Sequence, residues 1–436
     1  MGGARHLVIV LAPALAALLV TLAERCAVPS RSEAEAPSER ALARRLVLRQ
    51  PSHFAPHAWR GAPPLPSLRG AWARNAPLSR AERQNWNGTA LAPESFAEDA
   101  HGQLLASVAF GAVLRAPRDP ERPGTPVFFT PAAMDGYTGP LEQHPRYAWC
   151  RAQAAAKNTS AEEACGRPLG IRVRNSTLYV ADAYHGIFAL QLDGDEPARW
   201  LVRPDDVTPP MRFINDLDVA SDGAVYFTDS SDVHPRRDNR LLVFNNPPGA
   251  RLLVLRPGAA KPEVLLRGFH FLNGVQLLPD ESALVVVELG RLRLLRCRLP
   301  IPPGAACAPE VFADALPGVP DNIRLSRNAT SLLVGCAAPV ARPFSLLRWL
   351  WTHQRAARLL GTLLSRLPRE RALAALEARV PVGGLVLRLA LDGTPLQALH
   401  DPTGRVPLIS HAHEAADGAL WLGSASNDFA ARVPPP

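Results

Sequence analysis

The residues most able to do chemistry are carboxylate and amide side chains that stand where β-strands are expected to begin. The stretch RFINDLDVASDGAVYFTDSS, residues 212–231, opens on an Asn-Asp pair, crosses an Asp-Gly turn and continues as an alternating aromatic and β-branched run. The pattern recurs, and its copies align at these positions: Glu94, Gly170, Asn215, Asn273, Asp321 and His411. The two carboxylates and two amides of this set suit Ca²⁺, which binds such oxygens at ~2.3–2.6 Å. They predict a calcium site, although a lone Asn or Asp at such a place also caps a tight turn.

Proton transfer at such a site would need an acid or base. The candidates are Asp321 itself, His270, and His411 at the start of the last copy. His411 and His413 share one face of a strand, but two histidines without further ligands are typical of a surface or a channel lining. The sequence contains neither a Gly-x-Ser-x-Gly nucleophile elbow nor a Gly-rich phosphate loop.

Six copies of the strand–turn–strand pattern organise the chain from residue 91 onward. They begin near residues 93, 167, 212, 271, 319 and 409. Several starts are ~45–60 residues apart, and repeated four-stranded units of this length predict radially stacked blades. A β-sandwich would not explain six similar copies. The fold class expected is therefore all-β, a six-bladed β-propeller over residues 91–436.

Residues 344–380 interrupt the pattern within the fifth copy. The segment FSLLRWLWTHQRAARLLGTLLSRLPRERALAALEARV has apolar residues at three- and four-residue steps. This spacing predicts one or two amphipathic helices, interrupted near Pro368. Two interpretations are open: a helical cap that packs on the propeller face, and a basic helix that contacts a membrane.

The N-terminal residues predict a membrane anchor. Residues 7–23, LVIVLAPALAALLVTLA, are apolar and uncharged, and as a helix would reach roughly 25 Å, just short of a ~30 Å hydrocarbon core. No small-x-small cleavage site follows cleanly, which favours an uncleaved signal anchor over a cleaved signal peptide. We expect a short cytoplasmic tail (1–6), the anchor (7–23), a stalk and approach segment (24–90) and then the propeller. The protein would be single-pass type II, with its propeller in the ER lumen or at the cell surface.

Sequons and cysteines agree with an exported body. Asn-x-Ser/Thr sequons occur at Asn87, Asn158, Asn175 and Asn328. Beside an export signal they predict N-glycosylation. Two closely spaced cysteine pairs, Cys150 with Cys165 and Cys297 with Cys307, could each form a disulfide in an oxidising compartment.

The net charge of +8 does not indicate a nucleic-acid partner. Nearly all of the positive residues are arginines, and they are scattered through Ala- and Pro-rich sequence. No dense basic block is interleaved with aromatic residues, as nucleic-acid binding would require. A solvated basic surface is the better interpretation, with attraction to anionic lipid headgroups second.

From about residue 91 to its end, the chain resembles the strictosidine synthase-like family. The motifs that carry the resemblance are PESFA, CGRPLGI, LYVADAYHGI, FINDLDVASDGAVYFTDSS, FLNGVQL, VPDNIR and ADGALWLGS. The family fold is a six-bladed propeller. The wider superfamily includes paraoxonases, regucalcin and related lactonases and phosphotriesterases, which use an axial Ca²⁺.

The resemblance implies roles for particular residues. The superfamily's ligand motifs match Glu94, Asn215 in IND, Asn273 in LNG and Asp321 in PDN, with Asn322 in addition. In those enzymes the metal polarises a carbonyl or phosphoryl oxygen while a nearby acid or histidine activates water. The resemblance also implies that Cys150–Cys165 is the family's disulfide just before the second blade.

The chain departs from the plant synthases of the family. Their catalytic Glu lies seven residues before the glycine of the closing Asp-Gly, and in this chain that position is His411, with no Glu at Ser410 or Ala412. The function expected is a membrane-anchored, weakly active Ca²⁺-dependent arylesterase or lactonase acting on a small ester or lactone. The alternatives are a non-catalytic propeller that binds a partner and, last, a condensing synthase.

Overall fold

The computed structural model describes residues 57–340, 345–364 and 383–435, with residues 368, 371, 373 and 374 between the last two ranges. The expected cytoplasmic tail (1–6) and anchor (7–23) lie outside this part of the chain, as do the stalk residues up to 56. Among the described residues, no helix is both long and apolar enough to cross a membrane.

The described strands form six four-stranded antiparallel sheets. The first three are β2 (Phe96–Glu98), β3 (Leu104–Ser107), β4 (Ala112–Arg115) and β5 (Thr125–Phe129); β6 (Pro168–Arg174), β7 (Thr177–Asp182), β8 (Gly186–Gln191) and β9 (Arg199–Val202); β10 (Ile214–Val219), β11 (Val225–Asp229), β12 (Ala250–Leu255) and β13 (Glu263–Phe269). The last three are β14 (Leu272–Leu277), β15 (Ala283–Glu288), β16 (Arg293–Arg298) and β17 (Glu310–Ala313); β18 (Gly318–Leu325), β19 (Ser331–Pro339), β20 (Gly384–Ala390) and β21 (Pro395–Asp401); β22 (His411–Glu414), β23 (Leu420–Gly423), β24 (Ala430–Val433) and β1 (Glu82–Gln84). The expectation of an all-β fold is confirmed.

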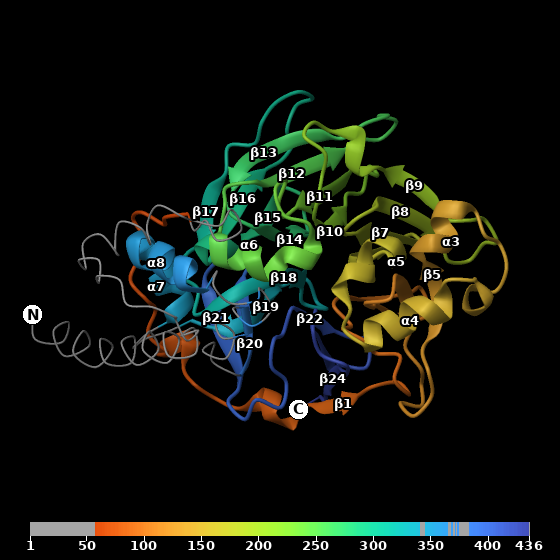
Figure 1. The fold of residues 1–436 in the computed structure, drawn as a ribbon, viewed down its shortest axis with the longest axis horizontal. Helices are drawn as coiled ribbons and strands as arrows, with labels where there is room; N and C mark the ends of the chain where they lie inside the picture. The colour runs from red at the N-terminus through yellow and green to blue at the C-terminus, as the bar shows by residue number, and fades with distance from the viewer. Residues whose placement is uncertain are drawn as a thin grey trace, which may run out of the picture.

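The sheets are arranged around their first strands. β10 contacts β6 and β14, β18 contacts β14 and β22, and β2 contacts β6 and β22. In Figure 1 β10, β14, β18 and β22 lie near the middle of the molecule, whereas β9 and β13 lie toward its rim. This is the arrangement of a propeller-type fold, in which the innermost strands line a central channel.

The last sheet is completed by a strand from the beginning of the folded region. β1 pairs with β24 in antiparallel register, Glu82 opposite Arg432 and Gln84 opposite Ala430. β1 lies within residues 24–90, which the sequence assigned to a stalk and approach segment. The structure therefore joins the end of that segment to the sheets, and the boundary expected at residue 91 leaves β1 out.

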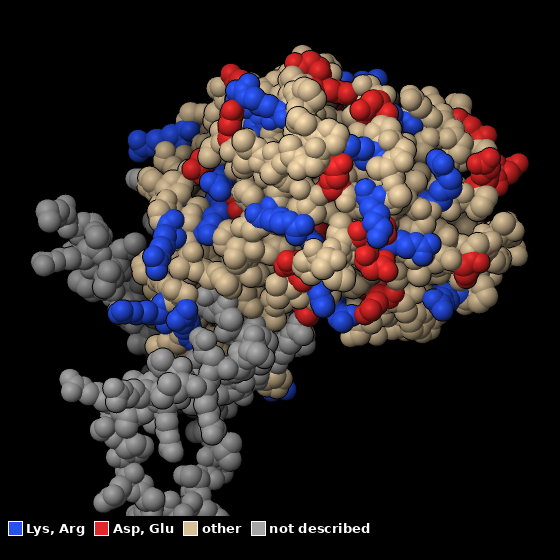
Figure 2. All heavy atoms as spheres, turned by 90° about the horizontal axis from the view of Figure 1, so that it is seen from above, with Lys and Arg blue, Asp and Glu red and all other residues tan. Residues whose placement is uncertain are grey.

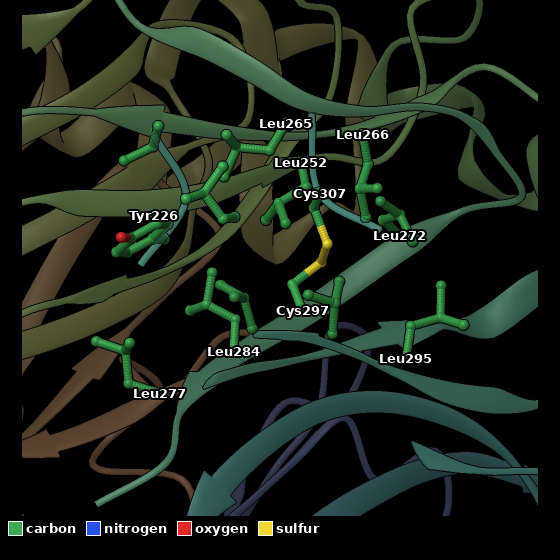
Figure 3. Packing of buried hydrophobic residues seen from close by; sticks show 14 of the residues in the cluster. Tyr226, Leu252, Leu265, Leu266, Leu272, Leu277, Leu284, Leu295, Cys297 and Cys307 are labelled. Atoms are coloured by element: carbon green, nitrogen blue, oxygen red, sulfur yellow. A yellow bond between two sulfur atoms is a disulfide. The ribbon is translucent and has the colours of Figure 1, made fainter. Parts of the chain in front are cut away.

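The hydrophobic core lies between neighbouring sheets. All residues of β10, β14 and β15 are buried, because each sheet is covered on both faces. Figure 3 shows one such layer, where Leu252 and Leu265 of the third sheet face Leu284 and Leu295 of the fourth. The disulfide between Cys297 and Cys307 lies inside this layer, so the second cysteine pair that the sequence left open is formed.

The described helices emerge at the end of the sheets where the first strands begin. They are α3 (Thr130–Asp135), α4 (Tyr147–Ala155), α5 (Glu162–Cys165), α6 (Asn239–Asn245), α7 (Leu346–Thr352) and α8 (Gln354–Leu364). Neighbouring strands alternate in direction, so the β5–β6, β11–β12 and β19–β20 connections that carry these helices all leave at that end. We call this end the channel mouth.

α7 and α8 lie between β19 and β20, inside the segment where helices were expected. Leu350 of α7 and Leu360 of α8 pack with Phe244 of α6 in one buried apolar cluster. The Trp351 indole N–H also donates to the Val243 carbonyl at 2.9 Å. These contacts favour the helical-cap interpretation. α7 ends at Thr352 and α8 begins at Gln354, so one break falls at His353. Pro368 also lies outside any helix among the described residues, in agreement with the interruption expected there.

Candidate metal centre

Local irregularities of the first strands position the aligned polar residues. In β10 the pairing register shifts between Ile214 and Leu217, which takes the Asn-Asp pair out of the regular ladder. The register of β14 shifts between Leu272 and Val275, and that of β18 between Pro320 and Ile323. Bulges of this kind re-aim side chains, and here each falls on a predicted ligand.

The aligned side chains are buried at the channel mouth. Glu94, Asn215, Asn273, Asp321 and Asn322 all belong to the buried polar residues, with exposed fractions of 9 % or less. Four of them carry a buried side-chain oxygen, Oδ1, with no hydrogen-bond donor: Asn215, Asn273, Asp321 and Asn322. Buried oxygens normally have a partner, so a cluster of unpartnered ones calls for a cation or ordered water.

The amide of Asn215 is oriented by a neighbour. Its Nδ2 donates to Ser230 Oγ at 2.9 Å, and that hydroxyl donates in turn to the Leu272 carbonyl of the next sheet at 2.6 Å. The amide nitrogen is therefore held toward the sheets, which leaves Asn215 Oδ1 as the free atom. The Thr228 hydroxyl also donates to a carbonyl of the next sheet, that of Asn273, at 2.6 Å.

The two carboxylates of the set influence each other. Burial raises the pKa of Asp321 well above its usual value, the charge of Glu94 raises it further, and a hydrogen bond from the Asn273 side chain opposes both. Burial likewise raises the pKa of Glu94, against the nearby charges of Arg167 and Arg236. Glu94 and Asp321, predicted as partners from distant parts of the sequence, are thus close enough to repel each other.

Two buried arginines that the sequence analysis did not select lie beside these carboxylates. Arg167, which precedes β6, places Nη2 3.2 Å from Glu94 Oε2. Arg236 places Nη1 3.0 Å from Glu162 Oε1 of α5. Arg167 stands in CGRPLGI, two residues after Cys165 of a disulfide, and that position was the available signal. The Cys150–Cys165 disulfide is formed as the resemblance implied.

The fit of these residues to a cation is favourable. They supply hard oxygens, two of them on carboxylates, and several of those oxygens have no other partner. In the described part of the chain no group of three or more His, Cys, Asp or Glu residues is placed to bind a metal. That finding reflects the composition of this set, which has only two carboxylates and takes its other oxygens from amides.

We call the proposed ligands the ring: Glu94, Asn215, Asn273, Asp321 and Asn322. A layer of charged residues lies deeper in the channel than this ring. Asp216 accepts Arg324 Nη1 at 2.8 Å and Arg172 Nη1 at 3.4 Å, and it also accepts the Val275 N–H at 3.0 Å. This carboxylate is fully engaged, which explains why Asp216 is no ligand although it stands next to Asn215. Gly170 supplies no ligand either, and a Cβ there would lie 2.3 Å from Asp216 Oδ1.

His411 lies one residue deeper than the alignment placed it. Ser410 is at ring level, where its carbonyl accepts the Asn322 N–H at 2.9 Å. His411 Nε2 instead faces the Phe96 N–H at 3.4 Å, and its Nδ1 is buried without a partner. Burial, together with the charge of Arg324, lowers the pKa of His411 well below its usual value, so its imidazole is neutral.

His270 is not brought to the ring. Its Nδ1 contacts the Asn246 carbonyl at 2.7 Å, and its Nε2 accepts Arg291 Nη2 at 2.6 Å. Burial and the charge of Arg291 lower the pKa of His270 to about 4. The lone pair that a general base needs is occupied by a guanidinium, so the expectation of His270 as base is not met.

The four predicted glycosylation sites are exposed: Asn87, Asn158, Asn175 and Asn328. Asn175 lies in the turn between β6 and β7, and Asn328 in the turn between β18 and β19. These turns are at the end of the sheets opposite the channel mouth. Glycans at these two turns would leave the mouth open, whereas Asn158 lies in the β5–β6 connection on the mouth side.

The sheets and the buried oxygens at their centre define an all-β protein of the propeller type with a polar site at its axis. Solved structures agree on the fold: a gluconolactonase from Xanthomonas campestris matches with a TM-score of 0.51 at 17 % identity, over 86 % of this chain and 99 % of that one. At that identity the likeness concerns the fold alone.

Sequence comparisons identify the family. The model named Strictosidine synthase matches residues 215–299, and the model named Strictosidine synthase-like, N-terminal matches residues 70–116. The adipocyte plasma membrane-associated protein of Gallus gallus is 38 % identical over 62 % of this chain and 64 % of its own length, so the match spans just under two thirds of that relative. The protein of the same name from Rattus norvegicus is 37 % identical over 64 % of this chain and 72 % of its own length. The chain belongs to the strictosidine synthase-like family.

Proposed function

We propose that the chain is a membrane-anchored glycoprotein with weak Ca²⁺-dependent arylesterase or lactonase activity at the channel mouth. The observation that carries the proposal is the cluster of buried, unpartnered oxygens on Asn215, Asn273, Asp321 and Asn322 beside Glu94. The fold likeness to a gluconolactonase supports it. The substrate class is a small ester or lactone.

Glu94, Asn215, Asn273 and Asp321 would hold the cation, with Asn322 beside them. Calcium at this position would supply Lewis-acid polarisation of a substrate carbonyl. Glu94 is committed to its ion pair with Arg167, whereas Asp321 forms no ion pair within the described residues. Asp321 is therefore the carboxylate available to take a proton from water. His411 lies one residue deeper than the proposed ligands, and the lone pair of its Nε2 faces the Phe96 N–H at 3.4 Å, so this nitrogen is not free to take a proton.

The organisation proposed around this site follows the sequence. The six sheets would be the six blades of one propeller, tethered by residues 7–23 as a type II membrane protein. Its propeller would lie in the ER lumen or at the cell surface, with glycans on the exposed sequons. The similarity to proteins named plasma membrane-associated supports a membrane location.

The test is hydrolysis of phenyl acetate and of a small lactone panel by the full chain in detergent, with calcium or with chelator. Turnover should require calcium and fall at least tenfold in Asn273→Ala, which removes one amide oxygen. Asp205→Asn, which changes an exposed carboxylate of η5 (Pro204–Asp206) that is not a proposed ligand, is the matched control and should keep the wild-type rate. A rate unaffected by chelator and by Asn273→Ala would remove the proposal.

A second candidate function is a non-catalytic binding propeller in which the cation is a structural plug. The observation that favours it is that Nε2 of His270 accepts a hydrogen bond from Arg291 and Nε2 of His411 faces the Phe96 N–H, so neither of these nitrogens is free to act as a base. Calcium that raises the melting temperature without any hydrolysis across the panel would decide for this alternative.

A further inference from the structure

A separate cavity lies beside the segment that enters the folded region. Its volume is about 240 Å³, and its lining includes Trp59, Arg60, Arg291, Arg293 and Asp314. Three arginines thus face one carboxylate. The cavity involves none of the proposed calcium ligands, since its residues come from the entry segment, from η7 (Leu289–Arg291) and from the beginning and end of the β16–β17 hairpin.

Trp59 organises this cavity. Its ring is contacted by the guanidinium of Arg291 at 5.4 Å and by that of Arg348 from α7 at 5.0 Å. The indole of Trp351 packs against it with a centroid separation of 6.3 Å. The tryptophan is itself buried, so two cations are held on one aromatic surface at the edge of the cavity.

Two of these guanidinium groups have donors without a partner. Arg348 is 7 % exposed, and its Nη1 is buried with no hydrogen bond; Nη1 of Arg291 is in the same state. A buried guanidinium N–H with no acceptor is costly, since donors on charged groups are normally satisfied. Arg348 contacts Trp59 but is not part of the lining, whereas Arg291 is, so the unmet donor of Arg291 favours an anionic acceptor in the cavity.

The nearby carboxylates do not neutralise the cluster. Glu288 is engaged by Arg293 Nε at 2.7 Å and by the His270 N–H at 3.0 Å. Asp314 accepts its neighbouring N–H from Ala315 at 2.7 Å and forms no ion pair within the described residues. Arg60 and Arg291, which also line the cavity, form no ion pair within the described residues.

We propose that the cavity beside Trp59 binds a phosphate-bearing anion, with Arg60 and Arg291 as its main contacts. A phosphate group offers several acceptor oxygens to converging guanidinium forks, which a single carboxylate cannot satisfy together. The volume is below the range of pockets for drug-sized ligands, so the ligand is a small phosphate ester or a headgroup. The chemistry is shared by a free phosphate and a phospholipid headgroup.

The helices near the cavity bear on whether the phosphate group belongs to a lipid headgroup or to a free phosphate compound. α8 follows α7 directly and exposes Leu359 by 40 %. A partly exposed leucine on the helix that follows α7 suits a lipid surface, while a free phosphate compound needs no such residue. The experiment therefore includes one ligand of each kind.

Binding is measured calorimetrically on the full chain in detergent, with chelator present so that the calcium site is silent. The probes are inorganic phosphate and water-soluble dibutanoyl phosphatidic acid, at constant ionic strength because exposed charges are screened by salt. The variants are Arg60→Glu, whose side chain is exposed and whose change spares the core, and Arg291→Gln. Arg118→Glu, on the exposed β4–β5 loop, is the charge-matched control.

Saturable binding by the wild-type protein and by Arg118→Glu, weakened at least tenfold in Arg60→Glu and Arg291→Gln, is expected; tenfold corresponds to about 1.4 kcal/mol. Tighter binding of dibutanoyl phosphatidic acid than of inorganic phosphate assigns the site to a lipid headgroup, and equal binding assigns it to a free phosphate. No saturable binding of either probe, or equal binding by Arg60→Glu and wild type, overturns the proposal. Loss of ester hydrolysis leaves this result untouched, since the two sites share no residue.

Discussion

Replacing Asp321 with Asn should make the protein more stable without calcium and less stable with it. In chelator, Asp321 is a buried carboxylate close to a second carboxylate, Glu94, with Oδ1 unpartnered. The amide has almost the same shape and no charge, so the substitution removes the repulsion. It also removes one of the two carboxylates that would bind the cation, so the stabilisation by calcium should be lost.

The size of both effects can be estimated. Relieving a buried, poorly satisfied charged group is worth about 1–3 kcal/mol. An unfolding entropy of ~2.1 cal/mol/K per residue over roughly 370 folded residues makes 1 kcal/mol equal to about 1.3 °C in Tm. The variant should therefore melt about 1–4 °C higher than wild type in chelator. Calcium at 1,000 times its Kd stabilises the wild type by about 4.1 kcal/mol, or about 5 °C, so the order reverses.

The assay is thermal unfolding of wild type, Asp321→Asn and Asp205→Asn in chelator and across a calcium titration. Asp205 is exposed, so its variant should follow the wild-type curve at every concentration. A variant that is less stable than wild type in chelator would show that Asp321 is satisfied without a cation. An equal rise of both proteins with calcium would show that the ion binds elsewhere.

Three further predictions concern the surroundings of the site. Arg167→Met should lower the free energy of unfolding by about 3–5 kcal/mol in urea, because it leaves Glu94 buried without its partner; a loss under 1 kcal/mol would refute this. The pKa of His270, lowered to about 4, means that the folded protein binds fewer protons than the unfolded chain, so stability is full above pH ~6.5 and is lost as pH falls toward 4. That loss is about 1–3 kcal/mol after discounting for partial solvent exposure, and pH-dependent denaturation of His270→Asn should lack it. The double variant Cys150→Ser/Cys165→Ser should lose about 3 kcal/mol in urea unfolding, since it opens a loop of 15 residues, whereas an unchanged midpoint would contradict the loop-entropy argument.

Repetition made the sheets predictable. Six similar strand–turn–strand copies cannot each bury two sheet faces alone, so they must stack on one another, and the structure has six four-stranded sheets. β1 was missed because Glu82–Gln84 is a three-residue strand without alternation. Its pairing is decided by the open edge of β24 and not by its own sequence.

The predicted ring positions could be found because they recur at the same point of each copy. Glu94, Asn215, Asn273 and Asp321 are all buried and stand at or near the starts of first strands, where the repeat placed them. The bulges that aim them could not be inferred, because a register shift depends on the partner strand. For the same reason, the alignment of the copies placed His411 level with the proposed ligands, where the structure has Ser410.

Arg167 and Arg236 show what local sequence cannot supply. Arg167 precedes β6 and Arg236 begins η6 (Arg236–Asp238), and apart from the disulfide cysteine near Arg167 nothing in the neighbouring sequence signals burial. Their positions follow from tertiary contacts with Glu94 and Glu162, which come from other sheets and connections. Charged residues at loop positions are exposed on most proteins, so the sequence alone favours the wrong environment for both.

The charges at the mouth limit how tightly a cation can bind there. Glu94, Glu162 and Asp321 carry three negative charges and the two arginines carry two positive ones, so the group has a net charge of −1 when all are ionised. Two carboxylates alone, without the arginines, would carry a net charge of −2. The arginines therefore weaken the site for a divalent cation, and the affinity expected is that of extracellular calcium modules, roughly 10⁻⁴–10⁻³ M. Such a site would fill at the calcium level outside the cell or in the ER lumen and stay empty in the cytosol, which agrees with the topology proposed from residues 7–23.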